Sequence, residues 1–436
     1  SNGRRTTMER FSKDSEECRI GSPSLPIPSA LAYGKSKGKV GGSFRWLIVA
    51  SAIIIQLCLG AVYAFSILVP PLEAEFGWKR IETSPAFTIA LLVFSISMIP
   101  AGRLQDRKGP KLVATAGGVI LGLGMVLSSF THSLPWLYMS YGVIGGLGIG
   151  LTYVTPITTC VKWFPEKKGL ISGLAVFGFG AGSIVFAPFW TFIIEVMGWR
   201  NTFLITGLLF TGFLLPSAQV LRNPPEDFKP STPKPSSQLP VAKDFYPSEL
   251  LKKPSFYAVW ISYWFGTSAG LMLIGHAKQI TMELTRLNDL EASLTVSILG
   301  MFNSFGRILW GFLGDRMRRE KVLALVFVLC FGGLFLAASF SGFVPLFLLG
   351  IVLTGLSFGG FLALYPTITS DYYGTKNLGT NYGIIFLAYG AGAILGPIMA
   401  GYFRTFFNSY IPSIYLAATL AIIGAFLALF LRRLHP

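Results

Sequence analysis

The sequence has few charged residues. They make up 13% of its 436 residues, where soluble domains carry about 25%. It also has only three histidines and four cysteines, and the cysteines show no paired spacing. This scarcity argues against a disulfide framework, a zinc site and histidine-based metal chemistry. Because 52% of the residues are hydrophobic, a disordered chain, a coiled coil and an ordinary soluble enzyme are also excluded.

Most of the sequence consists of long apolar stretches. A membrane-spanning helix needs about 20 apolar residues. We therefore predict an all-α integral membrane protein with twelve transmembrane helices. They are expected near residues 45–69, 85–104, 111–130, 135–160, 168–195, 199–221, 255–280, 291–313, 321–341, 343–370, 379–403 and 411–431.

The net charge of +16 follows from the distribution of basic residues among the loops. If both termini face the cytoplasm, 29 of the 36 lysines and arginines lie on that side and 6 lie outside. The remaining one, Arg307, lies within a predicted helix. The positive-inside rule therefore predicts a multi-pass protein of the plasma or inner membrane with cytoplasmic termini. It accounts for the basic excess without a nucleic-acid partner.

Polar segments divide the chain. Residues 1–43 are predicted to be a disordered cytoplasmic tail, and because the tail begins with Ser, part of it is expected to be an expression remnant. Residues 222–254 are rich in Pro, Lys and Ser and are predicted to be a cytoplasmic linker. The linker separates an N-terminal six-helix bundle over 44–221 from a C-terminal one over 255–436.

The two bundles repeat each other. GRLQDR at 102–107 matches GFLGDR at 311–316 with an offset of 209, and Pro156 matches Pro366 with an offset of 210. A chance match between apolar helices is the weaker explanation, because charged and proline positions are included. Two pseudo-symmetric six-helix bundles are typical of transporters that rock around a central site.

The repeated loop is a candidate conformational switch. In its first copy, GRLQDRKGPK at 102–111, the glycines permit close packing. Asp106 can accept hydrogen bonds from the positive end of a neighbouring helix. Such a contact can form in one state of a carrier and break in another; the alternative is a generic positive-inside turn. The residues assigned this role are Gly102, Asp106, Arg107, Gly311, Asp315 and Arg316.

These motifs and the 6+6 layout resemble the major facilitator superfamily, over about residues 44–432. GAVYAFS at 60–66, KWFPEKKG at 162–169 and GFGAGS at 178–183 are similar to the oxalate/formate antiporter group and the related monocarboxylate transporters. The resemblance implies transport of small carboxylates. No Gly-Lys-Ser/Thr motif follows the glycine runs, so we expect gradients rather than ATP to drive transport.

Arg307 is the central candidate for substrate binding. A cation in the membrane core costs about 2.5–3.5 kcal/mol, and no acidic residue lies within one turn on the same helix. Asn303 shares its face but cannot neutralise it. A guanidinium without a counter-ion can serve as a binding site for a carboxylate. The alternative is that the Arg307 side chain extends (snorkels) to the membrane surface and binds no substrate. The family resemblance also places the substrate arginine at this position.

Two positions depart from the family. The oxalate carriers have a lysine in helix 11 where this chain has Tyr389, which favours a monocarboxylate over a dianion. The animal monocarboxylate carriers place an Asp one turn before the helix-8 arginine, where Asn303 stands here. The Asp–Arg proton switch of that branch is therefore missing or altered.

Aromatic residues could complete the cavity. The resemblance implies an aromatic cage, and core packing or lipid contact is the alternative for each member. The candidates are Tyr63, Tyr153, Phe361, Tyr365, Phe386 and Tyr389. His276 is a weaker candidate for proton coupling, with an interfacial role as the alternative.

The sequence thus predicts a secondary active transporter of lactate- or pyruvate-like monocarboxylates, working by proton-coupled symport and alternating access. Its expected partners are the carboxylate, protons or a counter-anion, and the lipid bilayer, with no cofactor, metal or catalytic residue. One alternative is an oxalate/formate-type anion exchanger. A non-transporting carboxylate receptor is another, which the paired loop motifs disfavour.

Overall fold

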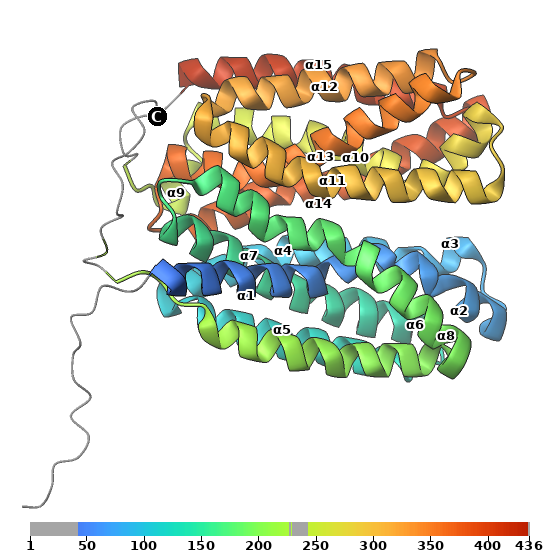
Figure 1. Cartoon of the computed structure of the whole chain (residues 1–436), viewed down its shortest axis with the longest axis horizontal. Helices are drawn as coiled ribbons and strands as arrows, with labels where there is room; N and C mark the ends of the chain where they lie inside the picture. Colours follow the sequence, from blue (N-terminus) through green and yellow to red (C-terminus); the bar gives the residue numbers. More distant parts are fainter. Residues whose placement is uncertain (1–41, 226–227, 229–242, 435–436) are drawn as a thin grey trace, which may run out of the picture. The chain divides into compact units, whose positions relative to one another are not determined.

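The computed structural model describes residues 42–225, 228 and 243–434 (Figure 1). Of the tail predicted over 1–43, residues 1–41 lie outside these residues, as do residues 226–227 and 229–242 of the linker predicted over 222–254. We call residues 42–225 the first half and residues 243–434 the second half. In Figure 1 the first half runs from blue to green and the second half from yellow to red.

Both halves are built of helices. The first half contains α1 (Gly42–Gly60), the 3₁₀ segment η1 (Ala61–Ile67), α2 (Val69–Phe76), α3 (Arg80–Thr83), α4 (Pro85–Lys108), α5 (Pro110–Ser128), α6 (Leu134–Leu137), the π-helical segment η2 (Tyr138–Gly145), α7 (Gly146–Trp163) and α8 (Lys168–Val220). The second half contains α9 (Pro247–Leu250), α10 (Pro254–Thr285), α11 (Asp289–Arg316), α12 (Arg319–Ser339), α13 (Val344–Tyr373), α14 (Leu378–Phe407), α15 (Ile411–Phe430) and the 3₁₀ turn η3 (Leu431–Leu434).

Twelve membrane crossings result. Eleven helices in the described residues are long and apolar enough to span a bilayer. The 53-residue α8 is broken at Gly198, whose φ of 81° is non-helical, so α8 supplies two crossings. A positive φ is accessible to glycine without steric cost, which explains a sharp turn between the helices predicted over 168–195 and 199–221. The predicted all-α membrane fold is confirmed.

Two helices depart from regular α geometry in ways the hydropathy pattern did not predict. The first crossing becomes a 3₁₀ helix at Ala61, and the fourth begins with the π-helical stretch Tyr138–Gly145. Apolar periodicity is too coarse to distinguish these forms from an α-helix. Such irregular stretches are frequent at functional sites.

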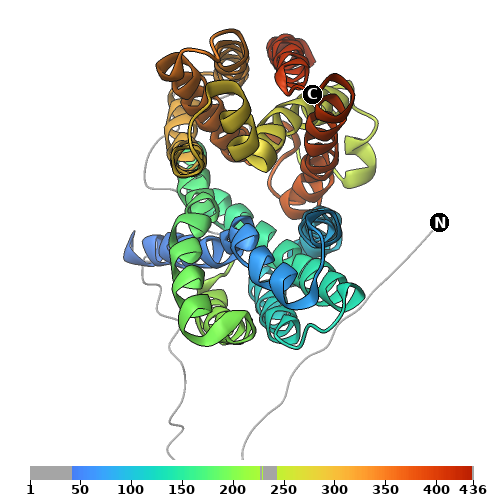
Figure 2. The same ribbon diagram turned by 90° about the vertical axis from the view of Figure 1, so that its right-hand side faces the viewer.

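The halves pack against each other mainly through two helix pairs, α4 with α14 and α8 with α11. Figure 2, which looks along the helices, shows both pairs. Glycines permit the close approach: a Cβ added at Gly102 would overlap the backbone of Gly379, and one added at Gly311 would overlap that of Gly169. Gly102 and Gly311 are thus equivalent contact points of the repeat.

Candidate functional site

Arg307 lies on α11 and is fully buried, with 0% of its surface exposed. Its Nη1 donates to the backbone carbonyl of Val176 at 2.7 Å, and its Nη2 donates to Asn303 Oδ1 at 3.4 Å. Its Nε has no hydrogen-bond partner. No acidic side chain in the described part of the chain forms an ion pair with it. The guanidinium is therefore a buried cation held by neutral acceptors only.

Glycines on neighbouring helices place Arg307 at the junction of three helices. A Cβ added at Gly173 of α8 would overlap the backbone carbonyl of Arg307. One added at Gly359 of α13 would lie 2.9 Å from its backbone nitrogen. Larger residues at either site would push α11 away, so these glycines fix the depth at which the guanidinium lies.

Aromatic rings from both halves surround this cation. The Arg307 Cζ lies 5.7 Å from the ring centre of Phe179, which packs edge-on against Tyr63 at 5.2 Å and Tyr153 at 5.1 Å. Tyr63 and Tyr389 share a hydroxyl–hydroxyl hydrogen bond of 2.6 Å. Water-excluding walls of this kind strengthen the attraction between a guanidinium and an anion.

Phe386 of α14, in the second half, belongs to the same cluster. Its ring stacks on Tyr389 at 4.7 Å and lies 5.2 Å from Tyr153 and 5.1 Å from Phe94. The structure thus brings together Arg307, Asn303, Tyr63, Tyr153, Phe386 and Tyr389 of the predicted site.

Two predicted aromatics lie farther away. Tyr365 stacks on Tyr263 at 4.0 Å, and Tyr263 in turn lies 6.1 Å from Phe386. Phe361 packs on Phe327 at 4.5 Å and against Gly266, within the second half. The i, i+4 spacing that joins Phe361 to Tyr365 puts both rings on one helix face, but it does not determine which neighbouring helix that face meets.

His276 lies on α10, partly buried and apart from this cluster. Its ring lies 5.8 Å from that of Tyr410, and its Nδ1 has no hydrogen-bond partner. Nearby, Glu283 pairs with Arg404 at 2.9 Å and accepts from the backbone NH of Tyr410 at 3.0 Å. The structure gives His276 no contact with Arg307.

Asp106 fastens α4 to the start of α14. Its carboxylate accepts from the backbone NH of Gly379 at 3.0 Å, and from the backbone NH and hydroxyl of Thr380 at 2.7 and 2.8 Å. Lys162 approaches it at 4.0 Å. A carboxylate at a helix N-terminus satisfies free NH groups and complements the helix dipole.

Asp315 makes the matching contact in the opposite direction. Its two oxygens accept from the backbone NH groups of Gly169 and Leu170, both at 2.7 Å, at the start of α8. Each half thus caps a helix of the other half. We call the ends of the helices that carry Asp106 and Asp315 the motif end; in this structure the two halves are joined there.

A further ion pair joins the halves at the motif end, and two pairs within the second half surround it. Lys168 of α8 pairs with Asp371 of α13 at 3.0 Å. Arg319 pairs with Asp371 and with Asp315, the latter at 3.3 Å. Arg107 and Arg316, the arginines of the repeated motif, are exposed and take no part in these pairs.

A residue of the predicted linker, Asp244, also binds the loop before α14. Asp244 accepts from the backbone NH groups of Thr375 and Lys376, both at 3.0 Å. The backbone carbonyl of Phe245 accepts from the side chains of Asn377 and Asn381, both at 3.1 Å. The segment that Asp106 caps is therefore held from two sides.

The Major Facilitator Superfamily profile matches residues 49–308 and 277–436. The chain belongs to the major facilitator superfamily. It is therefore a multi-pass membrane transporter and not an enzyme, as the repeated motif predicted. Its fold is similar to that of the proton:xylose symporter XylE, with a TM-score of 0.70 at 16% identity over 90% of this chain and 96% of that one.

Curated members of the superfamily narrow the group. The chain is 34% identical to the uncharacterized MFS-type transporter YhjX of Escherichia coli over 80% of its own length and 86% of that protein. It is 28% identical to the oxalate:formate antiporter of Oxalobacter formigenes over 83% and 85%. It is 25% identical to human monocarboxylate transporter 11 over 94% and 88%. The predicted resemblance to this group is confirmed.

Several residues in and around the Arg307 cluster of this transporter were not predicted from the sequence. Tyr382 could have been found, because it lies four residues before Phe386 on the same helix face. Phe179 could also have been found, because it falls within the glycine run at 178–183. Phe94 and the Val176 carbonyl carry no sequence signal, since only the packing of separate helices brings Phe94 to Phe179 and Phe386 and the carbonyl to Arg307.

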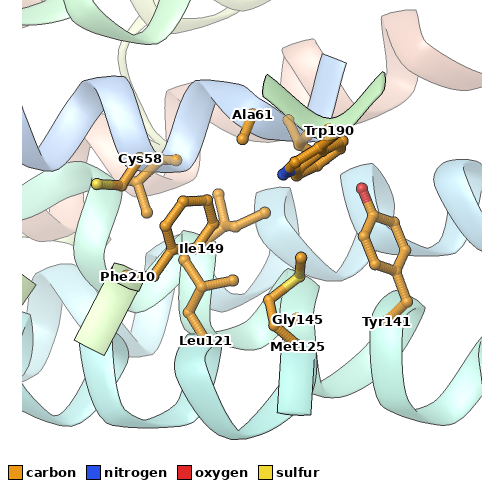
Figure 3. Close-up of a pocket in the computed structure, with 11 residues that line it drawn as sticks. Cys58, Ala61, Leu121, Met125, Tyr141, Gly145, Ile149, Trp190 and Phe210 are labelled. Carbon is orange, nitrogen blue, oxygen red and sulfur yellow. The ribbon is translucent and has the colours of Figure 1, made fainter. Parts of the chain in front are cut away.

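A small cavity lies inside the first half, between η1, α5, η2 and α8 (Figure 3). It has room for about one water molecule and is lined mainly by apolar side chains. Two donors, Tyr141 Oη and Trp190 Nε1, have no hydrogen-bond partner. Because no cation lines it, it lacks the charge that an anion would require.

Proposed function

We propose that this transporter carries small monocarboxylates such as lactate or pyruvate, with Arg307 binding the carboxylate. One observation carries the proposal: a fully buried guanidinium has only neutral acceptors and a free Nε. Leaving such a charge unneutralised is costly, and a carboxylate matches its fork geometry. The names of the relatives, an oxalate:formate antiporter and monocarboxylate transporters, support the same substrate class.

The charge of the site favours a monoanion. At the position where the oxalate carriers resembled by this chain have a lysine, Tyr389 bonds to Tyr63 instead. A dianion would therefore meet one cation where it needs two. The alternative, an oxalate/formate-type exchanger, is supported by the 28% identity to the oxalate:formate antiporter and opposed by this missing charge.

We further propose that transport is proton-coupled symport by alternating access, with the motif end and both termini in the cytoplasm of a cell membrane. The positive-inside distribution supports this orientation. The reciprocal caps of Asp106 and Asp315 are suited to a gate that opens when the halves rock apart, whereas a non-transporting receptor needs no paired gate. His276 is the proposed, weaker candidate for coupling.

Uptake into proteoliposomes tests this function. Purified protein is assayed with radiolabelled lactate, pyruvate, formate and oxalate, with and without an inward proton gradient. We expect lactate or pyruvate uptake that the gradient stimulates. Oxalate uptake that depends on internal formate and is unchanged by the proton gradient would favour the exchanger instead.

A further inference from the structure

The N-terminus of α14 is capped by the other half of the protein instead of by its own N-cap residue. The backbone NH groups of Gly379 and Thr380 donate to Asp106 of α4 at 3.0 and 2.7 Å. Asn377 is the N-cap residue of α14, yet its side chain makes no hydrogen bond to the helix. Asparagine is among the best N-cap residues, and its side-chain oxygen normally accepts from the second or third NH group of the helix. In α14 these groups belong to Gly379 and Thr380, so Asn377 can compete with Asp106 for the same donors.

The predicted linker holds the Asn377 side chain away from these donors. The Nδ2 of Asn377 donates to the backbone carbonyl of Phe245 at 3.1 Å. The backbone of Asn377, with φ of −109° and ψ of 28°, is not in the extended form that N-cap residues usually adopt. Phe245 is itself fixed, because its ring is buried and its backbone NH donates to the carbonyl of Tyr373 at 3.1 Å. The contact with Phe245 therefore leaves the NH groups at the start of α14 available to Asp106.

The equivalent helix start in the first half has no such competitor. Asp315 accepts from the backbone NH groups of Gly169 and Leu170, and the N-cap residue of α8 is Lys167. The offset of 210 between the halves aligns Lys167 with Asn377. A lysine side chain has no acceptor, so it cannot take the place of Asp315. The two gate contacts thus share one geometry, but only the N-cap residue of α14 can replace the carboxylate.

We propose that Asn377 is a positioning residue of the gate, which caps α14 in place of Asp106 when the motif end opens. This inference rests on the proposed alternating access and is independent of the substrate. Opening withdraws Asp106 from Gly379 and Thr380 and leaves their NH groups without a partner in the chain, which is unfavourable at a helix N-terminus. Rotation of Asn377 from the Phe245 carbonyl to these groups supplies a replacement acceptor. The linker contact at Phe245 therefore opposes opening, and its release favours opening.

Serine and alanine at position 377 separate capping from the linker contact. Both lack the amide donor, and they differ from each other by one oxygen atom. Serine caps helices about as well as asparagine, whereas alanine does not. Double electron–electron resonance between spin labels at Lys108→Cys and Lys321→Cys, both exposed, measures the open-to-closed ratio of the motif end. The full chain is used in a background without the native cysteines. We expect the ratio to be about 2- to 30-fold higher in Asn377→Ser than in Asn377→Ala.

Lys167→Ala is the matched control, because it truncates the equivalent N-cap residue, which carries no capping oxygen. It should keep the wild-type ratio. A shift in Lys167→Ala as large as the difference between the two variants at position 377 would show that truncation, and not capping, sets the ratio, and would contradict the proposal.

Equal ratios in Asn377→Ser and Asn377→Ala would overturn the alternative cap, because a residue that only anchors the linker loses the same amide in both variants. Asp106→Asn tells this failure apart from a failure of the gate. If Asp106→Asn opens the motif end while the two variants at position 377 agree, only the role of Asn377 is wrong. If Asp106→Asn also leaves the distances unchanged, the proposed gate fails, and the alternative cap with it.

Discussion

The hydroxyl groups of Tyr63 and Tyr389 lie 2.6 Å apart and join the two halves beside Arg307. We propose that Tyr389 takes the place of the lysine in the oxalate carriers that the sequence resembles. The neutral pair therefore leaves Arg307 as the single charge of the cluster, which suits a substrate with one carboxylate.

Tyr389→Lys should change the charge class of the substrate. A second buried cation would lack a partner when a monocarboxylate binds, so lactate affinity should fall by about ten-fold or more, and oxalate affinity should rise. Tyr389→Phe is the control, because it removes the hydroxyl without adding charge and should keep the preference for monoanions. Calorimetry with both anions measures the change; an unaltered lactate-to-oxalate ratio in Tyr389→Lys would argue against the assignment.

Asp106→Asn should loosen the motif end. An amide keeps some capping ability but loses the charge that three donors and Lys162 share. Loss of a helix cap costs about 0.5–2 kcal/mol, enough to shift the balance between closed and open states by about 2- to 30-fold. Substrate affinity should change little, whereas transport should slow.

Distances measured by double electron–electron resonance test this shift between closed and open states. Spin labels at Lys108→Cys and Lys376→Cys, both exposed at the motif end, should report a longer mean distance in Asp106→Asn in a background without the native cysteines. Asp244→Asn, which weakens a contact to the same loop from the linker side, should have a smaller effect. Unchanged distances with normal turnover would show that Asp106 does not control the gate.

Gly311→Ala should block closure of the motif end. Its Cβ would overlap the backbone carbonyl of Gly169, and backbone cannot move aside as a flexible side chain can. Gly300→Ala, in the same helix α11, is the matched control because nothing lies within 4 Å of its Cβ. We expect Gly311→Ala to lose most transport while Gly300→Ala retains it. Equal uptake rates for the two variants would contradict the tight contact.

Orientation is tested by labelling with an impermeant thiol reagent in intact cells. Cysteines replace His132 and Lys108, both exposed and at opposite ends of α5. The positive-inside rule predicts external labelling at position 132 but not at 108. The reverse pattern would invert the proposed topology.

The sequence predicted the fold well because each membrane crossing must satisfy its backbone within itself, so its apolar length is visible locally. The helical boundary at Gly198 was also predictable. The 3₁₀ segment η1 and the π-helical segment η2 were not, since hydropathy does not record hydrogen-bond register.

The site was predictable only in part. The i, i+4 spacing of Asn303 and Arg307 fixes their contact within one helix. Contacts such as Arg307 with Val176 depend on how separate helices pack, and the pattern of one helix does not contain that information. For the same reason the sequence did not show that Phe361 packs on Phe327 and Tyr365 on Tyr263, outside the cluster.

The central claim is that the charge of Arg307 binds the substrate carboxylate. Calorimetry of monocarboxylate binding to Arg307→Ala tests this claim most directly. Loss of a charge-assisted contact in a buried site costs about 2–5 kcal/mol, so affinity should fall by tens- to thousands-fold. Arg307→Lys should also bind poorly, because an ammonium cannot reproduce the fork. Arg404→Ala, which removes a partly exposed arginine paired with Glu283, should bind normally. Wild-type affinity in Arg307→Ala would contradict the account and leave Arg307 without a role in substrate binding.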